Sequence, residues 1–265
     1  AVRVIERLAI IGVGLIGGSL ARALRAAGVV GEVTGCGRSV ENLALAFDLG
    51  VIDAYTHDPA VAVRDADMVF LAVPLGAMRP ILARVRDHLR PDAVITDGGS
   101  VKGSVVADAR EALGPALPRF VPGHPIAGTE RSGVAASFPE LYHKRRVILT
   151  PLAETDADAL GKVQTMWEAA GAKVAQMDVA HHDEVLAATS HLPHMLAFGL
   201  VDALARRPDN DEIFRYAAGG FRDFTRIASS SPVMWRDICI ANKEALSAML
   251  GRFGEEMTDL AETVR

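Results

Sequence analysis

The sequence predicts an α/β fold, a doubly wound and mostly parallel sheet, followed by an all-helical domain. A glycine-rich motif lies between an apolar strand pattern and a helical pattern near the N-terminus. Strand and helix patterns then alternate as far as residue 177, which is typical of a parallel sheet covered by helices. From residue 180 onward no strand pattern appears. We therefore expect an α/β domain at residues 1–177 and a helical domain at residues 178–265.

The glycine motif is the strongest local signal. An apolar run at residues 8–11 predicts a buried strand, and residues 19–25 predict a helix. Between them Gly12, Gly14 and Gly17 form G-x-G-x-x-G, and a second strand is expected after the helix. This is the first β-α-β unit of a Rossmann-type, dinucleotide-binding fold. In that unit Gly12 permits the tight turn, Gly14 lets the backbone approach a pyrophosphate, and Gly17 lets the helix pack closely.

Further cofactor-binding residues are expected around this motif. Leu15 and Ile16, within the glycine motif, are expected to bind the cofactor. The N-terminus of the helix that follows supplies free N–H groups and a partial positive charge, which suit phosphates. Val73 and Pro74 end a later apolar strand, and ligands of doubly wound sheets bind beyond the carboxyl ends of the strands. The alternative interpretation is a glycine turn in an α/β domain that binds no cofactor.

The end of the second strand, residues 35–39, bears on which dinucleotide binds. An NAD-binding domain usually places Asp or Glu about 20 residues beyond the motif to bind the ribose hydroxyls. No carboxylate occurs in residues 35–39, whereas Arg38 and Ser39 can bind a 2′-phosphate by charge-assisted hydrogen bonds. We expect NADP, with NAD as the weaker alternative. In the competing interpretations Arg38 is only solvated, or it stacks on adenine and serves both cofactors.

The remaining elements follow in order. Strands are expected at residues 67–73, 93–96, 119–121, 146–150 and 173–176, with helices at 79–89, 103–113 and 156–170. In the second domain helices are expected at 181–206 with a kink at Pro193, and at 211–218, 221–228 and 232–262. This segment is short for an independent core. Its apolar faces would be better buried against a second copy in a homodimer, and they include Met249, Leu250, Phe253, Met257 and Leu260.

Composition narrows the functional class. The net charge is −5, and no Lys/Arg block resembles a nucleic-acid footprint. Cys36 and Cys239 provide neither a disulfide framework nor metal-ligand spacing. No signal peptide and no apolar run of about 18 or more residues is present. We therefore expect a cytoplasmic protein that acts on a small molecule, without nucleic-acid or membrane partners.

His124 is the first catalytic candidate. It lies in a segment framed by Gly and Pro, residues 123–130, directly after the strand expected at 119–121. That position is at the nicotinamide end of a dinucleotide-binding sheet. Neutral imidazole is suited to accept a proton near pH 7. In a dehydrogenase, His124 could take the proton of a hydroxyl group as the hydride leaves.

Five segments, taken in order, resemble the prephenate/arogenate dehydrogenase family of tyrosine biosynthesis. They are D-G-G-S-V-K at 97–102, G-H-P-I-A-G-T-E at 123–130, S-H-L-P-H at 190–194, G-G-F-R-D-F-T-R at 219–226 and M-W-R-D at 234–237. With the glycine motif, the resemblance covers nearly the whole chain. It implies oxidative decarboxylation of a cyclohexadienyl substrate, a nucleotide-binding N-terminal domain and a helical domain that dimerises.

The resemblance also implies roles for individual residues. His124 would accept the proton of the substrate's C4 hydroxyl. Ser100 would hydrogen-bond to that hydroxyl or orient His124, and its alternative role is to cap the next helix. Arg226 would bind the ring carboxylate with both guanidinium nitrogens, with an ordinary surface arginine as the alternative. His194 would contact the substrate's side chain.

Five other residues match the family pattern more loosely. Thr129 and Glu130 are expected to shape the pocket, although Glu130 could equally be a charge at a helix N-terminus. Gly219, Asp223 and Trp235 belong to the substrate-domain pattern. Trp235 is expected either to reach the active site of a partner subunit or to be a buried anchor.

A metal site is not expected. His191 and His194 share a helical face, but no H-E-x-x-H motif and no third ligand accompany them. Hydride transfer also needs no metal. We interpret His191 as structural, and His181 and His182 as residues at the start of a helix.

Several alternatives remain open at this level. Prephenate and arogenate differ only in a keto or amino group, and Glu140 and Asp223 are the acidic candidates near such an amine. Tyrosine feedback is not decided by the sequence. A dehydrogenase of the β-hydroxyacid type would rely on Lys243 and would leave the segment around His124 unexplained. A catalytically silent NADP-binding sensor is the third possibility.

Overall fold

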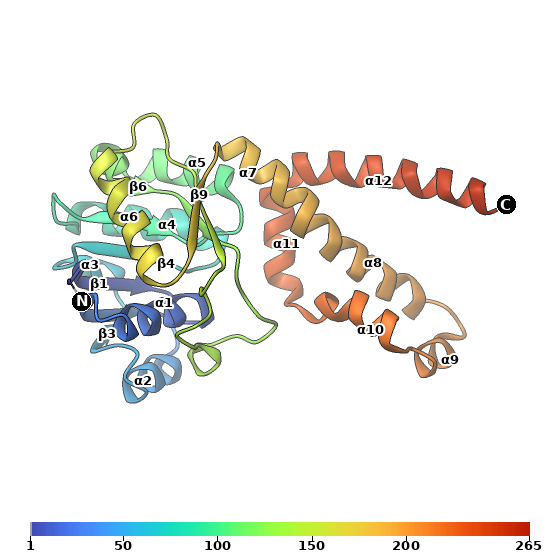
Figure 1. Ribbon diagram of the computed structural model, residues 1–265, viewed down its shortest axis with the longest axis horizontal. Coiled ribbons are helices and arrows are strands. Elements are labelled where there is room, and N and C mark those ends of the chain that lie inside the picture. Colours follow the sequence, from blue (N-terminus) through green and yellow to red (C-terminus); the bar gives the residue numbers. More distant parts are fainter. Residues whose placement is uncertain (1) are drawn as a thin grey trace. The chain divides into compact units, whose positions relative to one another are not determined.

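The computed structural model describes residues 2–265, which form two compact units (Figure 1). Unit 1 ends at His182, and unit 2 runs from Asp183 to Arg265. The boundary falls inside helix α7 (Val179–Leu186). The domain boundary that the sequence predicts, after residue 177, lies just before this helix.

Unit 1 is built on a six-stranded sheet in which all neighbouring strands are parallel, in the order β3-β2-β1-β4-β5-β6. This order confirms the predicted doubly wound sheet, and the strand order reverses between β1 and β4. The strands are β1 (Ile5–Ile11), β2 (Val30–Cys36), β3 (Ala54–Thr56), β4 (Met68–Leu71), β5 (Val94–Asp97) and β6 (Phe120–Val121).

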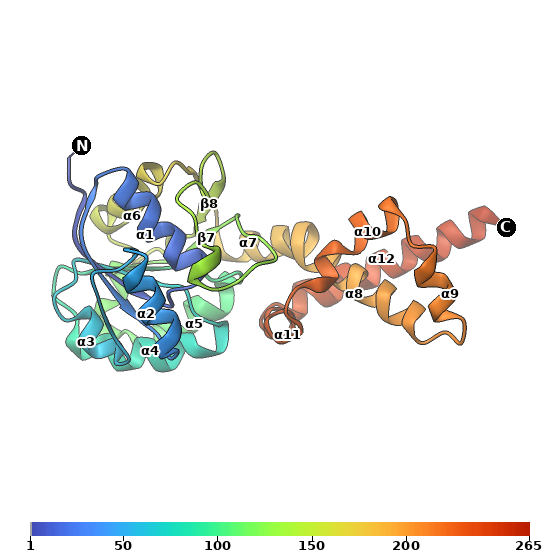
Figure 2. The ribbon, with the colours of Figure 1, turned by 90° about the horizontal axis from the view of Figure 1, so that it is seen from below.

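Helices cover both faces of this sheet (Figure 2). Successive side chains of a strand point to opposite faces. Ile10 therefore packs in one core cluster with residues of α1 and α6, whereas Ile11 packs in a second cluster with residues of α3, α4 and α5. The helices of unit 1 before α7 are α1 (Leu15–Ala26), α2 (Val40–Asp48), α3 (Pro59–Val63), α4 (Met78–Val85), α5 (Lys102–Ala112) and α6 (Ala157–Ala169).

A second, three-stranded sheet departs from the sequence prediction. It consists of β7 (Gly123–Pro125), β8 (Arg146–Leu149) and β9 (Lys173–Gln176), with β7 antiparallel and β9 parallel to β8. The prediction of one continuous sheet, with a loop after residue 121, is therefore wrong in this region. Pro122 lacks an N–H for a sheet ladder, and the chain changes sheets at this residue.

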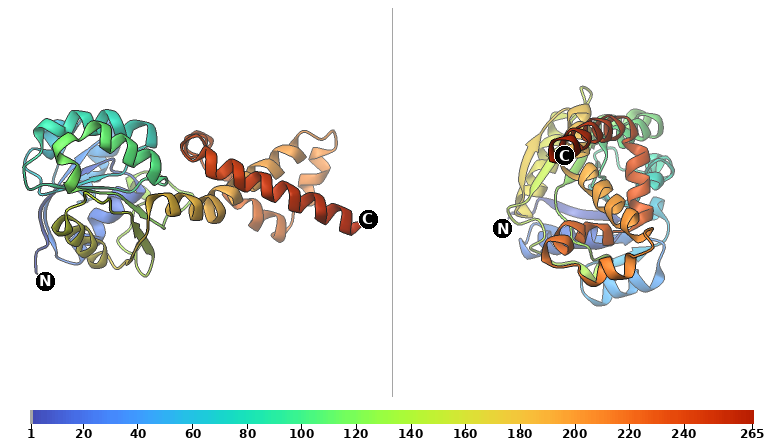
Figure 3. Two further views of the ribbon diagram at one scale, coloured as in Figure 1. Left: turned by 90° about the horizontal axis from the view of Figure 1, so that it is seen from above. Right: turned by 90° about the vertical axis from the view of Figure 1, so that its right-hand side faces the viewer.

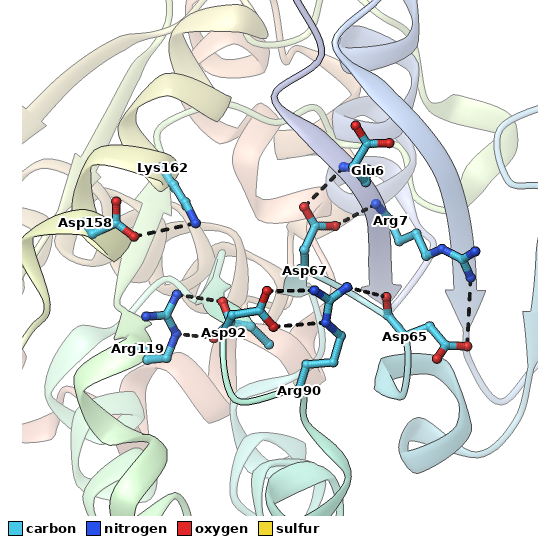
Figure 4. A network of polar contacts seen from close by, with 10 residues as sticks. Glu6, Arg7, Asp65, Asp67, Arg90, Asp92, Arg119, Asp158 and Lys162 are labelled. Carbon is cyan, nitrogen blue, oxygen red and sulfur yellow. Dashed lines mark hydrogen bonds and ion pairs between the residues drawn. The ribbon is translucent and has the colours of Figure 1, made fainter.

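The amino ends of the strands carry charged surface residues (Figure 4). The Asp67 carboxylate, just before β4, accepts the backbone N–H groups of Glu6 and Arg7 in β1, at 3.1 and 2.6 Å. Arg90 forms a bidentate ion pair with Asp92 before β5. The Asp67 contacts connect the amino ends of β1 and β4. This edge of the sheet lies opposite the carboxyl ends of the strands, where ligands of this fold bind.

Unit 2 contains helices only. They are the rest of α7, a π-helical turn (Ala187–His191), α8 (Leu192–Ala205), α9 (Asn210–Arg215), α10 (Gly219–Thr225), a 3₁₀ turn (Arg226–Ser229), α11 (Pro232–Ala241) and α12 (Lys243–Val264). Figure 3 shows α12 from two further directions, ending at the C-terminus. Residues 251–265 are exposed except for the half-buried Phe253. Among residues 2–265, no helix is long and apolar enough to cross a membrane.

Two helices expected to be continuous are interrupted. The helix expected at 181–206 is interrupted by the π-helical turn, which ends two residues before Pro193. Proline has no backbone N–H to donate, so the regular α-helical hydrogen-bond pattern is broken here. The helix expected at 232–262 breaks at Asn242, whose φ and ψ are −116° and 32°. The Asn242 side chain donates to the carbonyl oxygen of Asp183 at 2.9 Å and to Nδ1 of His191 at 3.1 Å. These bonds hold Asn242 at the junction of α11 and α12.

Candidate active site

The three motif glycines are required for different physical reasons. Gly12 has φ +97°, and a Cβ there would lie 2.1 Å from the carbonyl oxygen of Ala72. A Cβ on Gly17 would lie 2.2 Å from the carbonyl oxygen of Gly12. A Cβ on Gly14 would meet no atom within 4 Å. Only at Gly14 is the space open, at the N-terminus of α1, where a bound phosphate would need it.

The N-terminus of α1 has the features of a phosphate cradle. Gly14 is its N-cap, and no side chain caps the helix. Leu15 and Ile16 lie in the first turn, whose N–H groups have no partner within the helix. Val73, which follows β4, lies against the glycine turn, and its Cγ1 is 3.2 Å from where a Cβ on Gly12 would be. Pro74, the next residue, is exposed. These residues fit a dinucleotide pyrophosphate.

Two side chains that the sequence did not indicate form hydrogen bonds with the backbone of this loop. Asn42 donates to the carbonyl oxygen of Val13 at 2.6 Å and accepts from the N–H of Val134 at 3.2 Å. The Tyr142 hydroxyl donates to the carbonyl oxygen of Ile16 at 2.5 Å. Burial raises the pKa of Tyr142, so this hydroxyl keeps its proton. These residues lie far from the glycine motif in sequence, which explains why no local pattern indicated them.

At the end of β2, Arg38 and Ser39 have different surroundings. Arg38 is exposed and has no hydrogen bond or ion pair within residues 2–265. The Ser39 hydroxyl caps α2 by accepting the N–H of Asn42 at 3.1 Å, and it lies 3.4 Å from Glu41. The guanidinium of Arg38 is thus the more available of the two groups for an incoming anion.

A buried ion pair lies at the carboxyl end of β5. Lys102 Nζ is 2.5 Å from Asp97 Oδ2, and both side chains are fully buried. The second Asp97 oxygen accepts the N–H of Gly123 at 3.0 Å, and Lys102 donates to the Gly123 carbonyl oxygen at 2.6 Å. The pair therefore holds both backbone groups of the residue directly before His124.

Ser100 lies between the two charged residues of this pair. Its side chain is half-buried, and the N-cap of α5 is Val101, with no side-chain hydrogen bond to the helix. The alternative role of Ser100 as a helix cap is therefore wrong. The same turn is fixed by the Gly99 N–H, which donates to Asp97 at 2.9 Å.

His124 lies in β7, opposite Ile148 of β8, and only 9% of it is exposed. Its Nδ1 is 2.8 Å from Nε2 of His182, and the two rings meet edge to face at a centroid distance of 5.1 Å. His182 lies in α7 and is fully buried. The sequence placed His182 at the start of a helix, which is where it lies, but missed this contact across 58 residues.

Thr129 and Glu130 lie on an exposed segment after β7. The Thr129 hydroxyl accepts the N–H of Arg131 at 3.2 Å. Glu130 lies outside every helix, so the alternative that it is an N-terminal helix charge is wrong.

In unit 2 an aromatic cluster surrounds His194. The ring of His194 stacks on Trp235 at a centroid distance of 3.6 Å, and His191 contacts the same indole at 5.9 Å. Trp235 itself is buried. Among residues 2–265, no group of three His, Cys, Asp or Glu side chains has the arrangement of a metal site.

The protonation of His194 follows from its contacts. Nδ1 lies 2.8 Å from the Ser190 carbonyl oxygen, which can only accept, so Nδ1 carries the hydrogen. Burial and the nearby charge of Arg226 lower the pKa of His194. Neutral His194 therefore presents the lone pair of Nε2 as an acceptor.

The other unit 2 candidates lie on or next to α10. Gly219 begins this helix, and Arg226 follows its last turn. Gly219, Asp223 and Arg226 are all exposed. Asp223 and Arg226 are three residues apart, so their side chains project from neighbouring positions of the helix surface.

Comparison with known proteins matches both parts of the chain. The family model described as prephenate dehydrogenase, nucleotide-binding domain, matches residues 20–176, and that described as prephenate dehydrogenase, dimerization domain, matches residues 178–265. A cyclohexadienyl dehydrogenase of Zymomonas mobilis is 41% identical over 265 residues, which cover 98% of this chain and 89% of the relative.

Solved structures agree with these matches. Prephenate dehydrogenase from Aquifex aeolicus, in complex with hydroxyphenyl propionate and NAD⁺, gives a TM-score of 0.91 at 42% identity and covers 98% of this chain and 90% of its own. Synechocystis arogenate dehydrogenase gives a TM-score of 0.81 at 29% identity and covers 98% of this chain and 92% of its own.

The glycine geometry predicts that two similar substitutions will have different effects. Gly14→Ala should lower dinucleotide affinity at least about tenfold, because the methyl group would fill the open space at the helix N-terminus. Its thermal stability should change little, since that methyl meets no protein atom. Gly17→Ala is the matched control and should lower thermal stability, because its methyl group meets backbone. Calorimetric titration and thermal melts would measure both effects. A Gly14→Ala variant with wild-type affinity would contradict the assignment.

Proposed function

The chain belongs to the prephenate dehydrogenase family, and from that premise we propose its reaction, its cofactor and the residues responsible. It is an oxidoreductase of the prephenate/cyclohexadienyl type. We propose that it oxidises L-arogenate, prephenate or both, giving L-tyrosine or 4-hydroxyphenylpyruvate. The observation that carries the proposal is the buried His124, held at the carboxyl ends of the strands by the Asp97–Lys102 pair.

The reaction requires one proton to be held and then returned. Both substrates carry a hydroxyl at C4 and a carboxylate at C1 of a cyclohexadienyl ring. As the hydride leaves C4, the hydroxyl O–H bond breaks, and Nε2 of His124 takes the proton. The C1–carboxylate bond then breaks, and its electron pair enters the ring, which becomes aromatic as CO₂ leaves. The phenolic oxygen recovers the proton from His124, so no proton is released overall.

The chain's residues bind and orient the reactants. Ser100 is proposed to hydrogen-bond to the C4 hydroxyl or to orient His124, and Arg226 to bind the ring carboxylate. His194 is proposed to contact the substrate's side chain. Further residues proposed to shape the substrate site are Thr129, Glu130, Gly219, Asp223 and Trp235.

The bound dinucleotide supplies the hydride acceptor. Its pyrophosphate is proposed to lie at the N-terminus of α1, held by the backbone of Gly14, Leu15 and Ile16. The residues proposed to flank it are Gly12, Gly17, Val73 and Pro74. We propose NADP⁺ as the preferred cofactor, since the available guanidinium of Arg38 suits a 2′-phosphate and residues 35–39 contain no carboxylate. The Aquifex relative was solved with NAD⁺, so NAD⁺ is retained as the weaker alternative.

A homodimer through unit 2 is proposed for the assembly. The family model over residues 178–265 is described as a dimerization domain. Apolar side chains are exposed on α11 and α12, namely Val233, Met234, Ile240, Leu250, Met257, Leu260 and Val264. Burial against a second copy would remove this apolar surface from water. The alternative of a β-hydroxyacid-type dehydrogenase depended on Lys243, which is exposed at the start of α12.

The role of His124 predicts a loss of turnover without a loss of cofactor binding. His124→Asn should lower kcat at least about 100-fold, because the amide cannot accept the hydroxyl proton. Affinity for the dinucleotide should stay within about twofold of wild type. Assays of both substrates with both cofactors, following the absorbance of the reduced nicotinamide, would measure kcat. Near wild-type turnover would remove His124 from the mechanism, and a wild-type protein inactive on both substrates would refute the proposed function.

The role of Arg38 predicts a change in cofactor preference. Wild type should favour NADP⁺ over NAD⁺ in kcat/KM by about 5- to 150-fold. This is the contribution expected from one charge-assisted hydrogen bond in an exposed or half-buried position. Arg38→Ala should reduce that ratio mainly through NADP⁺. Gly37→Asp should reverse the ratio by adding a ribose-binding carboxylate, and the fold has room because a Cβ there lies 3.6 Å or more from its neighbours. Equal efficiency with both cofactors, unaffected by Arg38→Ala, would contradict the preference.

The lowered pKa of His194 predicts a pH-dependent choice of substrate. Neutral His194 offers an acceptor, which suits the ammonium group of arogenate, whereas the keto group of prephenate needs a donor. As the pH falls through the lowered pKa, Nε2 gains a proton and becomes a donor. The ratio of kcat/KM for arogenate to that for prephenate should therefore fall in the acid range. Both substrates use the same catalytic base, so the titration of that base changes kcat/KM for the two substrates equally. It therefore does not change their ratio.

The control for this pH dependence is His194→Gln, which has no titrating group. In this variant the arogenate/prephenate ratio should not change between about pH 8 and pH 5. A wild-type ratio that is also constant over this range would show that His194 does not contact the distinguishing group.

A further inference from the structure

His182 forms a short polar contact with the proposed base, and the matched family descriptions assign it no role. Its Nε2 lies 2.8 Å from Nδ1 of His124, within unit 1. Both rings are buried, and His182 is fully so. The backbone N–H of His182 donates to the Asp178 carbonyl oxygen at 2.9 Å, which fixes it in the first turns of α7. The contact is therefore short, buried and built from two separate elements.

Hydrogen-bond chemistry restricts what this contact can be. Between two neutral imidazoles, one nitrogen of the pair must donate and the other must accept. If His182 donates, Nδ1 of His124 is the acceptor, and the hydrogen of His124 sits on Nε2. That tautomer cannot accept a substrate proton at Nε2. If His124 donates through Nδ1, its Nε2 keeps a lone pair and can act as a base.

We propose that His182 is a positioning residue of this reaction, since its Nε2 accepts the Nδ1–H of His124 and keeps Nε2 of His124 unprotonated, so that it can take the substrate's hydroxyl proton. This inference rests on the proposed function of His124 as the base. It assigns to a second histidine the task that a buried carboxylate performs in hydrolytic triads. His182 then carries its own hydrogen on Nδ1.

The backbone of His124 is positioned independently of His182. Gly123 is held through both its N–H and its carbonyl oxygen by the Asp97–Lys102 pair. His124 also pairs with Ile148 in the second sheet. The backbone and the ring of His124 are thus fixed by different partners, so loss of His182 should disturb the tautomer of the ring more than its location.

A neutral partner suits a base that must return its proton. When Nε2 of His124 takes the hydroxyl proton, the pair carries one positive charge in all. A carboxylate partner would stabilise that charge strongly and oppose release of the proton. With His182 as the partner, the proton can pass back from Nε2 of His124 to the phenolic oxygen as the ring becomes aromatic.

The kinetic test compares two substitutions at His182 with one at its neighbour. His182→Phe keeps a ring but removes the acceptor, and should lower kcat by about 10- to 1,000-fold, with KM and cofactor affinity nearly unchanged. His182→Gln keeps an acceptor at a similar reach and should recover part of the loss. His181→Gln is the matched control, since His181 is exposed, and should leave kcat within about twofold. A His182→Phe variant that folds and keeps wild-type kcat would overturn the proposal.

A second measurement does not depend on activity. Nitrogen-15 NMR of protein labelled in histidine side chains, with His124→Asn used to assign the signals, reports which ring nitrogens carry hydrogen. The expected result for wild type is a protonated Nδ1 and an unprotonated Nε2 on His124. A hydrogen on Nε2 of neutral His124 would overturn the proposal even if His182→Phe failed to fold. Because it needs no substrate, this result is also independent of whether the proposed reaction is correct.

Discussion

The buried ion pair between Asp97 and Lys102 is the constraint on which the site depends. Removing two charges from water is costly, and the cost is offset only when their geometry and their remaining hydrogen bonds are satisfied. Here both partners also bond to Gly123, one to its N–H and the other to its carbonyl oxygen. The electrostatic requirement of the pair therefore fixes a backbone position. That position is the point where the chain leaves the six-stranded sheet and starts the second one.

The rest of the catalytic arrangement in unit 1 follows from that fixed point. His124 comes next in the chain and pairs with β8, while its ring meets His182 of α7. Ser100 lies in the turn between the two charged residues. The glycine turn before α1 lies at the carboxyl end of β1 in the same sheet, held by Asn42 and Tyr142. The carboxyl ends of the strands thus carry the chemistry, while the charged residues at the amino ends tie strands together (Figure 4).

The sequence predicted structural features that are determined by residues close together in the chain. The glycine motif and most of the parallel strands are contiguous signals, and they lie close to where they were expected. The short strand β3 and the helices α2 and α3 were not predicted. Features set by distant partners were missed. His182 meets His124 across 58 residues, and the break at Asn242 depends on its bond to Asp183, 59 residues away. Strand β7 is only three residues long and exists because β8 pairs with it. No local periodicity carries such information.

The central claim is that the Asp97–Lys102 pair positions the catalytic segment and does not merely stabilise the fold. The most direct measurement is kcat, with the free energy of unfolding measured in parallel, for Asp97→Asn, Lys102→Met and the double variant. Our account predicts that each single variant loses turnover at least about tenfold and that the double variant loses about as much as either single one, because the pair acts as a unit. Folded variants that lose stability but keep wild-type kcat would contradict it.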